Sequence, residues 1–170
     1  MLGIGGKELS EENAAQTAKA LNIIQPDFIR VHATCIKLES KLGEFVRDGS
    51  FTLQSEEEIV IEQKLFLQQL HEMDSYYVNE HIVNLLLEVR GNLRTEKQEM
   101  LSTIDRFLTL PPDERLLFTV GRRLNIFFRL DDLKKPKLHQ KAGESLQQIL
   151  SKNPHVDFAA LCNYVRQSQI

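Results

Sequence analysis

The segment Tyr76 to Arg90, YYVNEHIVNLLLEVR, most constrains what this chain can fold into. At 100° per residue its apolar side chains would cover roughly 200° of a helix surface, about twice the arc that a surface helix buries. Glu80, His81, Asn84 and Glu88 occupy the remaining strip and are too polar for a membrane span. The segment therefore predicts a central helix at about 76–90 that neighbouring elements cover on more than one side.

The composition of the 170-residue chain is typical of one helical domain, because its 25 Leu outnumber Val and Ile together and only 8 residues are Gly. No apolar run approaches the roughly 18 residues of a membrane-spanning helix. The opening MLGIGGKELSEEN has neither the basic nor the apolar region of a secretory signal. Only two cysteines occur, Cys35 and Cys162, so a reducing compartment and a cytoplasmic location are expected. A net charge of −3 argues against a nucleic-acid partner.

One stretch, IRVHATC at residues 29–35, alternates between apolar and polar side chains. A period of two is typical of a half-buried strand, so we expect a strand at about 28–35. The competing interpretation is a helix with an apolar seam through Phe28, Val31, Cys35 and Leu38. Both place Cys35 on the apolar side, as a buried thiol.

Capping residues, glycines and prolines divide the rest of the chain into helices. Ser55 and Glu58 form a capping box, Gly49 and Gly91 follow expected helix ends, and Pro111 interrupts the pattern. Besides the central helix, the predicted helices cover about 10–24, 38–46, 56–73, 95–110, 113–133, 138–150 and 155–167.

The polar strip of the expected central helix is the first candidate site. Glu80, His81 and Asn84 would lie within about 100° of one another. They could contact a substrate, transfer a proton, or form a buried polar network, and a solvated face is the competing interpretation.

A basic strip on the expected helix 113–133 is the candidate partner-binding site. Arg115, Arg122 and Arg129 recur every seven residues with Phe118 between them, and guanidinium groups hold carboxylates or phosphates bidentately. Internal pairing of this strip with the acidic helix at 56–74 is the alternative.

Five stretches, taken in order, resemble the C-terminal half of radical S-adenosylmethionine (radical SAM) enzymes over about residues 1–133. They are GIGGKELSEENA, PDFIRVHATC, DGSFTLQSEEEIVIEQ, HIVNLLLEVRGNLRTEKQEMLSTIDRFL and LPPDERLLFTVGRRL. The resemblance implies a partial (β/α) barrel, S-adenosylmethionine and a four-iron cluster held by a C-x3-C-x2-C motif. It also makes Gly3, Gly5, Gly6 and Arg30 candidates for cofactor binding.

With this resemblance, the expected fold class is mostly α. A barrel remnant at 1–50, with the strand at 28–35 and optionally another at the extreme N-terminus, precedes a multi-helix bundle at 51–170 around helix 76–90. The two regions are expected to form one compact unit.

The cysteine motif of the resembled family is absent, since the chain has only two distant cysteines. The cluster therefore cannot be held by this chain alone, and a split or truncated enzyme is the leading interpretation. Its expected partner is a cluster-bearing N-terminal half or a second copy of the chain. A non-enzymatic interaction module that uses the basic face 115–141 and an anion-binding helical module are the alternatives.

Overall fold

The computed structural model describes residues 1–169 and is mostly helical, as expected. Three short strands form its sheet. The order of elements is α1 (Ser10–Ile24), β1 (Phe28–Arg30), α2 (Lys41–Asp48), α3 (Glu56–Gln69), β2 (Tyr76–Val78), β3 (Gly91–Asn92), α4 (Lys97–Leu108), α5 (Pro112–Arg123), the 3-10 helix η1 (Leu130–Lys134), α6 (Pro136–Lys152) and α7 (Phe158–Gln167).

The sheet has the order β1-β2-β3, in which β1 and β2 are parallel and β3 is antiparallel to β2. Leu2 extends it with a parallel bridge to Ala33, beyond the end of β1. The predicted strand is therefore present but shorter, and the optional strand at the N-terminus is reduced to this bridge. Helices connect the parallel segments, as parallel pairing requires. The sheet joins residues on both sides of position 50, since β1 pairs with β2.

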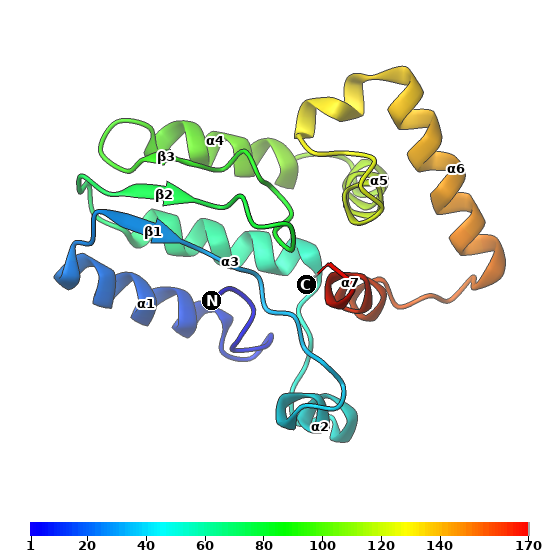
Figure 1. The fold of residues 1–170 in the computed structure, drawn as a ribbon, viewed down its shortest axis with the longest axis horizontal. Helices are drawn as coiled ribbons and strands as arrows, with labels where there is room; N and C mark the ends of the chain where they lie inside the picture. Colours follow the sequence, from blue (N-terminus) through cyan, green and yellow to red (C-terminus); the bar gives the residue numbers. More distant parts are fainter. Residues whose placement is uncertain (170) are drawn as a thin grey trace.

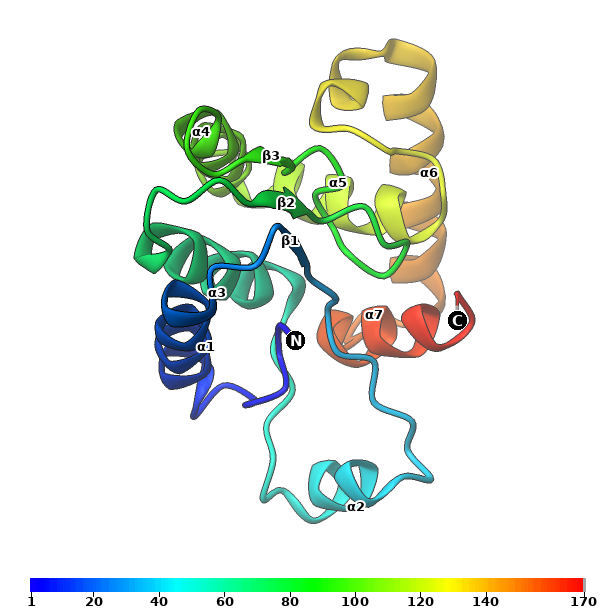
Figure 2. The same cartoon turned by 60° about the vertical axis from the view of Figure 1, so that its left-hand side comes forward.

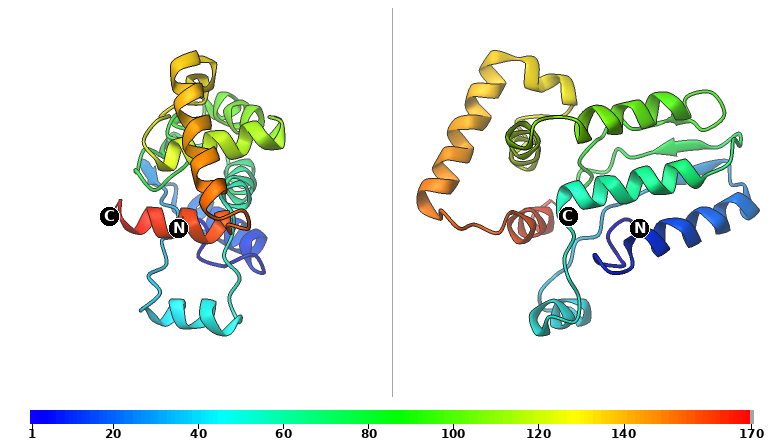
Figure 3. Two further views of the ribbon diagram at one scale, coloured as in Figure 1. Left: turned by 90° about the vertical axis from the view of Figure 1, so that its right-hand side faces the viewer. Right: turned by 180° about the vertical axis from the view of Figure 1, so that it is seen from behind.

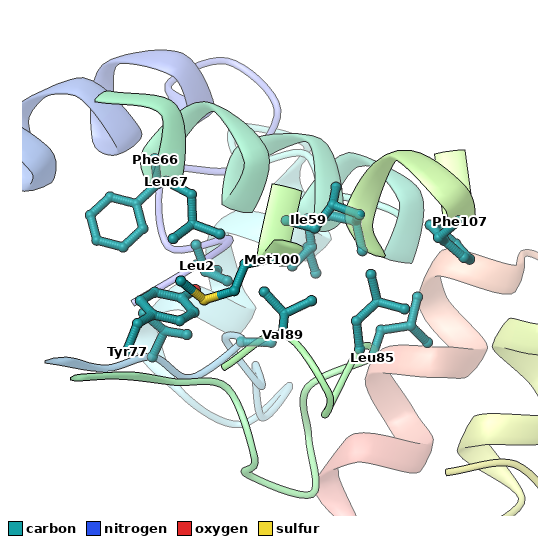
Figure 4. Close-up of a cluster of buried hydrophobic side chains, with 14 of the residues drawn as sticks. Leu2, Ile59, Phe66, Leu67, Tyr77, Leu85, Val89, Met100 and Phe107 are labelled. Atoms are coloured by element: carbon teal, nitrogen blue, oxygen red, sulfur yellow. The ribbon is translucent and has the colours of Figure 1, made fainter. Parts of the chain in front are cut away.

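Helices α1, α3 and α4 form a layer over one face of the sheet (Figures 1 and 3). Ile29 and Tyr77 lie in the buried core, and the Tyr77 hydroxyl accepts a hydrogen bond from Gln63 of α3 at 3.0 Å. Figure 4 shows this core, with Tyr77, Val89 and Met100 among the buried side chains. Within residues 1–169, no helix covers the opposite face of β1 and β2, and we call it the uncovered face (Figure 1).

The predicted central helix at 76–90 is wrong. The segment is central, because Tyr77, Leu86 and Val89 are fully buried, but it consists of β2 and a series of turns. Side chains replace helical hydrogen bonds here: the Asn79 amide donates to the Leu86 carbonyl at 2.7 Å. Apolar residues that point in many directions can be buried by an irregular chain inside the core just as well as by a helix. The aromatic and β-branched start, YYV, favours a strand.

Helix α5 ends at Arg123, ten residues before the predicted end at 133. The Gly121 carbonyl accepts hydrogen bonds from Ile126 at 2.8 Å and Phe127 at 3.2 Å, which turns the chain back on itself. Asn125 supplies the left-handed backbone, with φ of 57°. The fully buried Phe127 ring then packs directly against Gly121.

This turn leads to a prediction about two glycines. A Cβ at Gly121 would lie 2.4 Å from the Phe127 ring, so Gly121→Ala is expected to destabilise the fold by about 1–3 kcal/mol through overpacking. Gly143, within α6, has no atom within 4 Å of the corresponding position, and Gly143→Ala should stabilise by about 0.5–1 kcal/mol through helix propensity. Urea denaturation of both variants measures the difference. If both variants lost stability to a similar extent, this would contradict the packing of Phe127 against Gly121.

Helix α7 lies beside the segment that follows β1 (Figure 2). Asn163 of α7 donates to the Ile36 carbonyl and accepts from the Ile36 amide, each at 3.0 Å, and Gln167 donates to the same carbonyl at 2.8 Å. Helix α7 thus satisfies the backbone beyond the Leu2–Ala33 bridge. Helix α2 lies at the end of an arm that projects from the body (Figures 1 and 2).

Candidate functional site

The uncovered face carries a row of aromatic and basic side chains. Phe28 and Tyr76, on neighbouring strands, are 54% and 45% exposed and stack with ring centroids 6.4 Å apart. Arg30, two residues along β1, is exposed, and His32 follows it. Since alternate strand residues share a face, Phe28, Arg30 and His32 form one row. The row offers aromatic surface, a positive charge and an imidazole.

His81 completes this row from the loop after β2. Its ring centroid lies 4.1 Å from that of His32. The Val83 amide donates to His81 Nδ1 at 3.4 Å, which favours the neutral tautomer with the proton on Nε2. Burial, then His81 when it is protonated, then the charge of Arg30, lower the pKa of His32, so the His32 ring is neutral at pH 7. Neutral imidazoles can accept protons or hydrogen bonds from a bound molecule.

Asn84 holds the loop in place. Its buried amide accepts from the Ala33 amide at 2.7 Å and donates to the Val31 carbonyl at 2.9 Å and the Asn79 carbonyl at 3.2 Å. These bonds link the end of β1 to the loop after β2, so Asn84 is a positioning residue for the loop that carries His81.

Glu80 lies apart from this network. It is exposed and pairs with Arg90 at 3.0 Å. The three residues of the predicted helical strip therefore do not share one helix face: His81 contacts His32, Asn84 is buried, and Glu80 is at the surface. The absence of the helix is the reason.

The glycine loop forms a packed turn. Gly3 and Gly6 have φ of 80° and 63°, in the left-handed region. The Gly3 amide donates to both carboxylate oxygens of the buried Glu62 at 3.2 Å. The Gly3 amide is therefore paired with a carboxylate from α3 in this structure. A Cβ on Gly5 would approach the Leu9 carbonyl oxygen at 2.9 Å, which explains that glycine by packing.

The two cysteines do not fit an iron–sulfur cluster of the resembled class, which needs three thiolates. Cys35 is half-buried, against the expectation of full burial, and burial raises the pKa of its thiol. Cys162 is buried, and burial raises the pKa of its thiol to about 12. Within residues 1–169, no group of three or more His, Cys, Asp or Glu side chains could hold a metal ion.

The predicted basic strip is not one surface. Arg115 pairs with Glu57 of α3 at 3.0 Å, which agrees with internal pairing to the acidic helix. Phe118 is fully buried between Phe107 and Phe127, and Arg122 is also fully buried. Arg129 lies beyond the end of α5. Because α5 ends at Arg123, the spacing of seven no longer places Arg129 on the helix face of Arg115 and Arg122.

The sequence did not predict the buried ionic cluster that Glu56, Arg123 and Arg166 form. Both carboxylate oxygens of Glu56 accept from Arg123 of α5, at 2.9 and 2.7 Å, and Arg166 of α7 lies 3.1 Å away. Arg123 also donates to the Val83 carbonyl at 2.9 Å. The cluster thus ties α3, α5 and α7 to the loop of His81. In the sequence, Glu56 is indistinguishable from its neighbours Glu57 and Glu58 in the helix cap.

Among the residues that the structure describes, no helix combines the length and hydrophobicity needed to cross a bilayer. The chain matches no protein-family model. It also matches no curated protein and no solved structure.

Proposed function

We propose that this chain forms part of the barrel wall and the helical cap of a radical SAM-type enzyme, and that catalysis needs a cluster-bearing segment outside these residues. The observation that carries the proposal is the uncovered face. All-parallel sheets, in which helices join the strands, have both faces covered, as in (β/α) barrels, and β1 and β2 have this connection although β3 is antiparallel. Here helices cover one face, and the other presents exposed Phe28 and Tyr76.

The residues of the uncovered face have defined roles in this proposal. In a closed barrel they would face the interior, near the carboxyl ends of the strands where barrel enzymes bind ligands. Arg30 would hold an anionic group of the bound molecule, and His81 would exchange a proton with it, supported by His32. S-adenosylmethionine and the four-iron cluster would be held mainly by the other segment. The cluster would supply the electron for cleavage of S-adenosylmethionine.

The test combines this chain with a polypeptide from the same genome that carries C-x3-C-x2-C and ends before the last barrel strands. We expect the two to form a complex in sedimentation velocity, and the complex to cleave S-adenosylmethionine after reconstitution with iron and sulfide. This chain alone should form no stable cluster. In the complex, His81→Ala should reduce cleavage more than association.

Two matched variants locate the interface. Phe28→Glu places a charge on the uncovered face and should weaken association at least about tenfold, because charges are excluded from interface centres. Ile61→Glu places the same charge on α3, in the helix layer, where Ile61 is 40% exposed, and should leave association unchanged. Thermal melting confirms that both variants fold. Equal association of both variants, or no association of the wild-type chain, would refute the proposal.

A non-enzymatic interaction module is the second candidate. The uncovered face supports it as well, since an apolar face can bind a partner protein without chemistry. A complex that forms through Phe28 but never cleaves S-adenosylmethionine would favour this candidate. The anion-binding module has less support as a surface function, because Phe118 and Arg122 are buried.

A further inference from the structure

Arg122 is a buried cation that forms no ion pair with a carboxylate of residues 1–169. Its side chain is fully buried, and its Nη2 donates to the Ile82 carbonyl at 3.0 Å and the Asn84 carbonyl at 3.3 Å. Its Nε and Nη1 have no hydrogen-bond partner within residues 1–169. The adjacent Arg123 has the opposite environment, with two hydrogen bonds to Glu56.

A buried charge without a counterion is strongly unfavourable, so the two free N–H groups indicate a missing acceptor. Burial, followed by repulsion from Arg123, lowers the pKa of Arg122 to about 10, and the group is still charged at pH 7. None of the ion pairs in the described part of the chain includes Arg122 or Arg129. The missing acceptor is therefore expected to be an anion.

Phe128 connects this guanidinium to a pocket. The Arg122 Cζ lies 5.6 Å from the centroid of the Phe128 ring, and the ring is 48% exposed. The pocket has a volume of about 460 Å³. It is lined by Glu80, Leu87, Glu88, Arg90, Phe128 and Arg129. Neither His32 nor His81 lines it, so it is separate from the row on the uncovered face.

The charges of this pocket favour an anion. Glu80 and Arg90 neutralise each other at 3.0 Å. Glu88 Oε1 accepts from the Leu130 amide at 2.8 Å, whereas its Oε2 is buried without a partner. Burial raises the pKa of Glu88, and when this carboxyl is protonated it can donate a hydrogen bond to an anion. Arg122 and Arg129 are the two cations here that no carboxylate within residues 1–169 pairs.

We propose that this pocket binds a small oxyanion, a carboxylate or phosphate group, which Arg129 contacts at the rim and the free N–H groups of Arg122 contact once the Phe128 ring turns aside. Leu87 and the ring supply apolar contact for the rest of the ligand. The proposal does not depend on the barrel function, because the pocket lies within this chain.

The test follows the Nε–H signal of Arg122 by NMR while inorganic phosphate or acetate is added, with chloride at equal ionic strength as the control. We expect a saturable shift with one of the two oxyanions and none with chloride. Stronger binding of phosphate identifies a phosphate group, and stronger binding of acetate identifies a carboxylate. A shift that chloride reproduces, or no saturable shift, overturns the proposal.

Four variants sharpen the result. Arg122→Gln keeps a donor for the loop carbonyls but removes the charge, and should weaken binding at least about tenfold. Arg129→Gln, at the exposed rim, should weaken it about two- to fivefold. Arg47→Gln, on the distant α2, should leave it unchanged. Phe128→Ala should strengthen binding, because it exposes the guanidinium.

The surface variants keep the test decisive if Arg122→Gln fails to fold. Equal weakening by Arg129→Gln and Arg47→Gln would mean unspecific charge attraction and refute the site. Unchanged or weaker binding by Phe128→Ala would refute the role of the ring as a gate.

Discussion

Glu56→Gln is expected to lower the free energy of unfolding by about 3–5 kcal/mol, since it leaves Arg123 and Arg166 buried without a counterion. All three side chains are at most 4% exposed. Glu57→Gln is the matched control: it lies in the same helical turn and pairs with Arg115, but its side chain is 43% exposed. Pairs of that kind contribute at most about 1 kcal/mol. Urea denaturation of both variants provides the measurement.

The pKa of Glu56 also predicts how the effect of Glu56→Gln on stability changes with pH. Burial alone would raise the pKa of Glu56, but the attraction of Arg123 and Arg166 outweighs it and the pKa is lowered. A lowered acid pKa means that the stabilisation is present above the unfolded-state value of about 4.3 and is lost as pH falls through the folded-state value. The difference between wild type and Glu56→Gln should therefore shrink in acid. Equal losses for the Glu56 and Glu57 variants would contradict the buried cluster.

Leu86→Ala should destabilise the fold by about 2–5 kcal/mol, because the side chain is fully buried and its removal opens a cavity. Leu87 is only partly buried and lines the pocket beside Phe128, so Leu87→Ala should cost about 1 kcal/mol. The two substitutions remove the same atoms from adjacent positions. A denaturation midpoint of Leu86→Ala equal to that of wild type would show that the segment 76–90 is not central to the core.

The sequence predicted where the core would be better than it predicted the backbone that builds it. The apolar density of residues 76–90 located a largely buried segment, but periodicity cannot distinguish a helix covered on several sides from an irregular chain buried on all sides. The decisive residues were Asn79 and Asn84, whose amides bond the backbone of the loop. Such bonds depend on partners up to 53 positions away, as between Asn84 and Val31, and leave no local pattern.

The candidate site was predictable to a similar degree. Alternation at 29–35 placed Arg30 and His32 on one polar side, and the structure bears this out on the uncovered face. The contact between His32 and His81 was not predictable, because it depends on the parallel register of β1 and β2. The basic strip failed for two local reasons: α5 ends at Arg123, so Arg129 lies beyond the helix, and Arg122 lies on a helix face that is buried.

The hydrogen bonds between α7 and Ile36 can form only after α7 has been synthesised. Asn163 lies 127 positions after Ile36, so the ribosome completes the sheet and its helix layer well before α7 emerges. At the synthesis rates of living cells, about 5–20 residues per second, the Ile36 backbone remains unpaired for roughly 6–25 seconds. During that interval the nascent chain presents an open strand end, which is the kind of surface that another chain can pair with. Chaperone occupancy on translating ribosomes should accordingly persist until α7 is made.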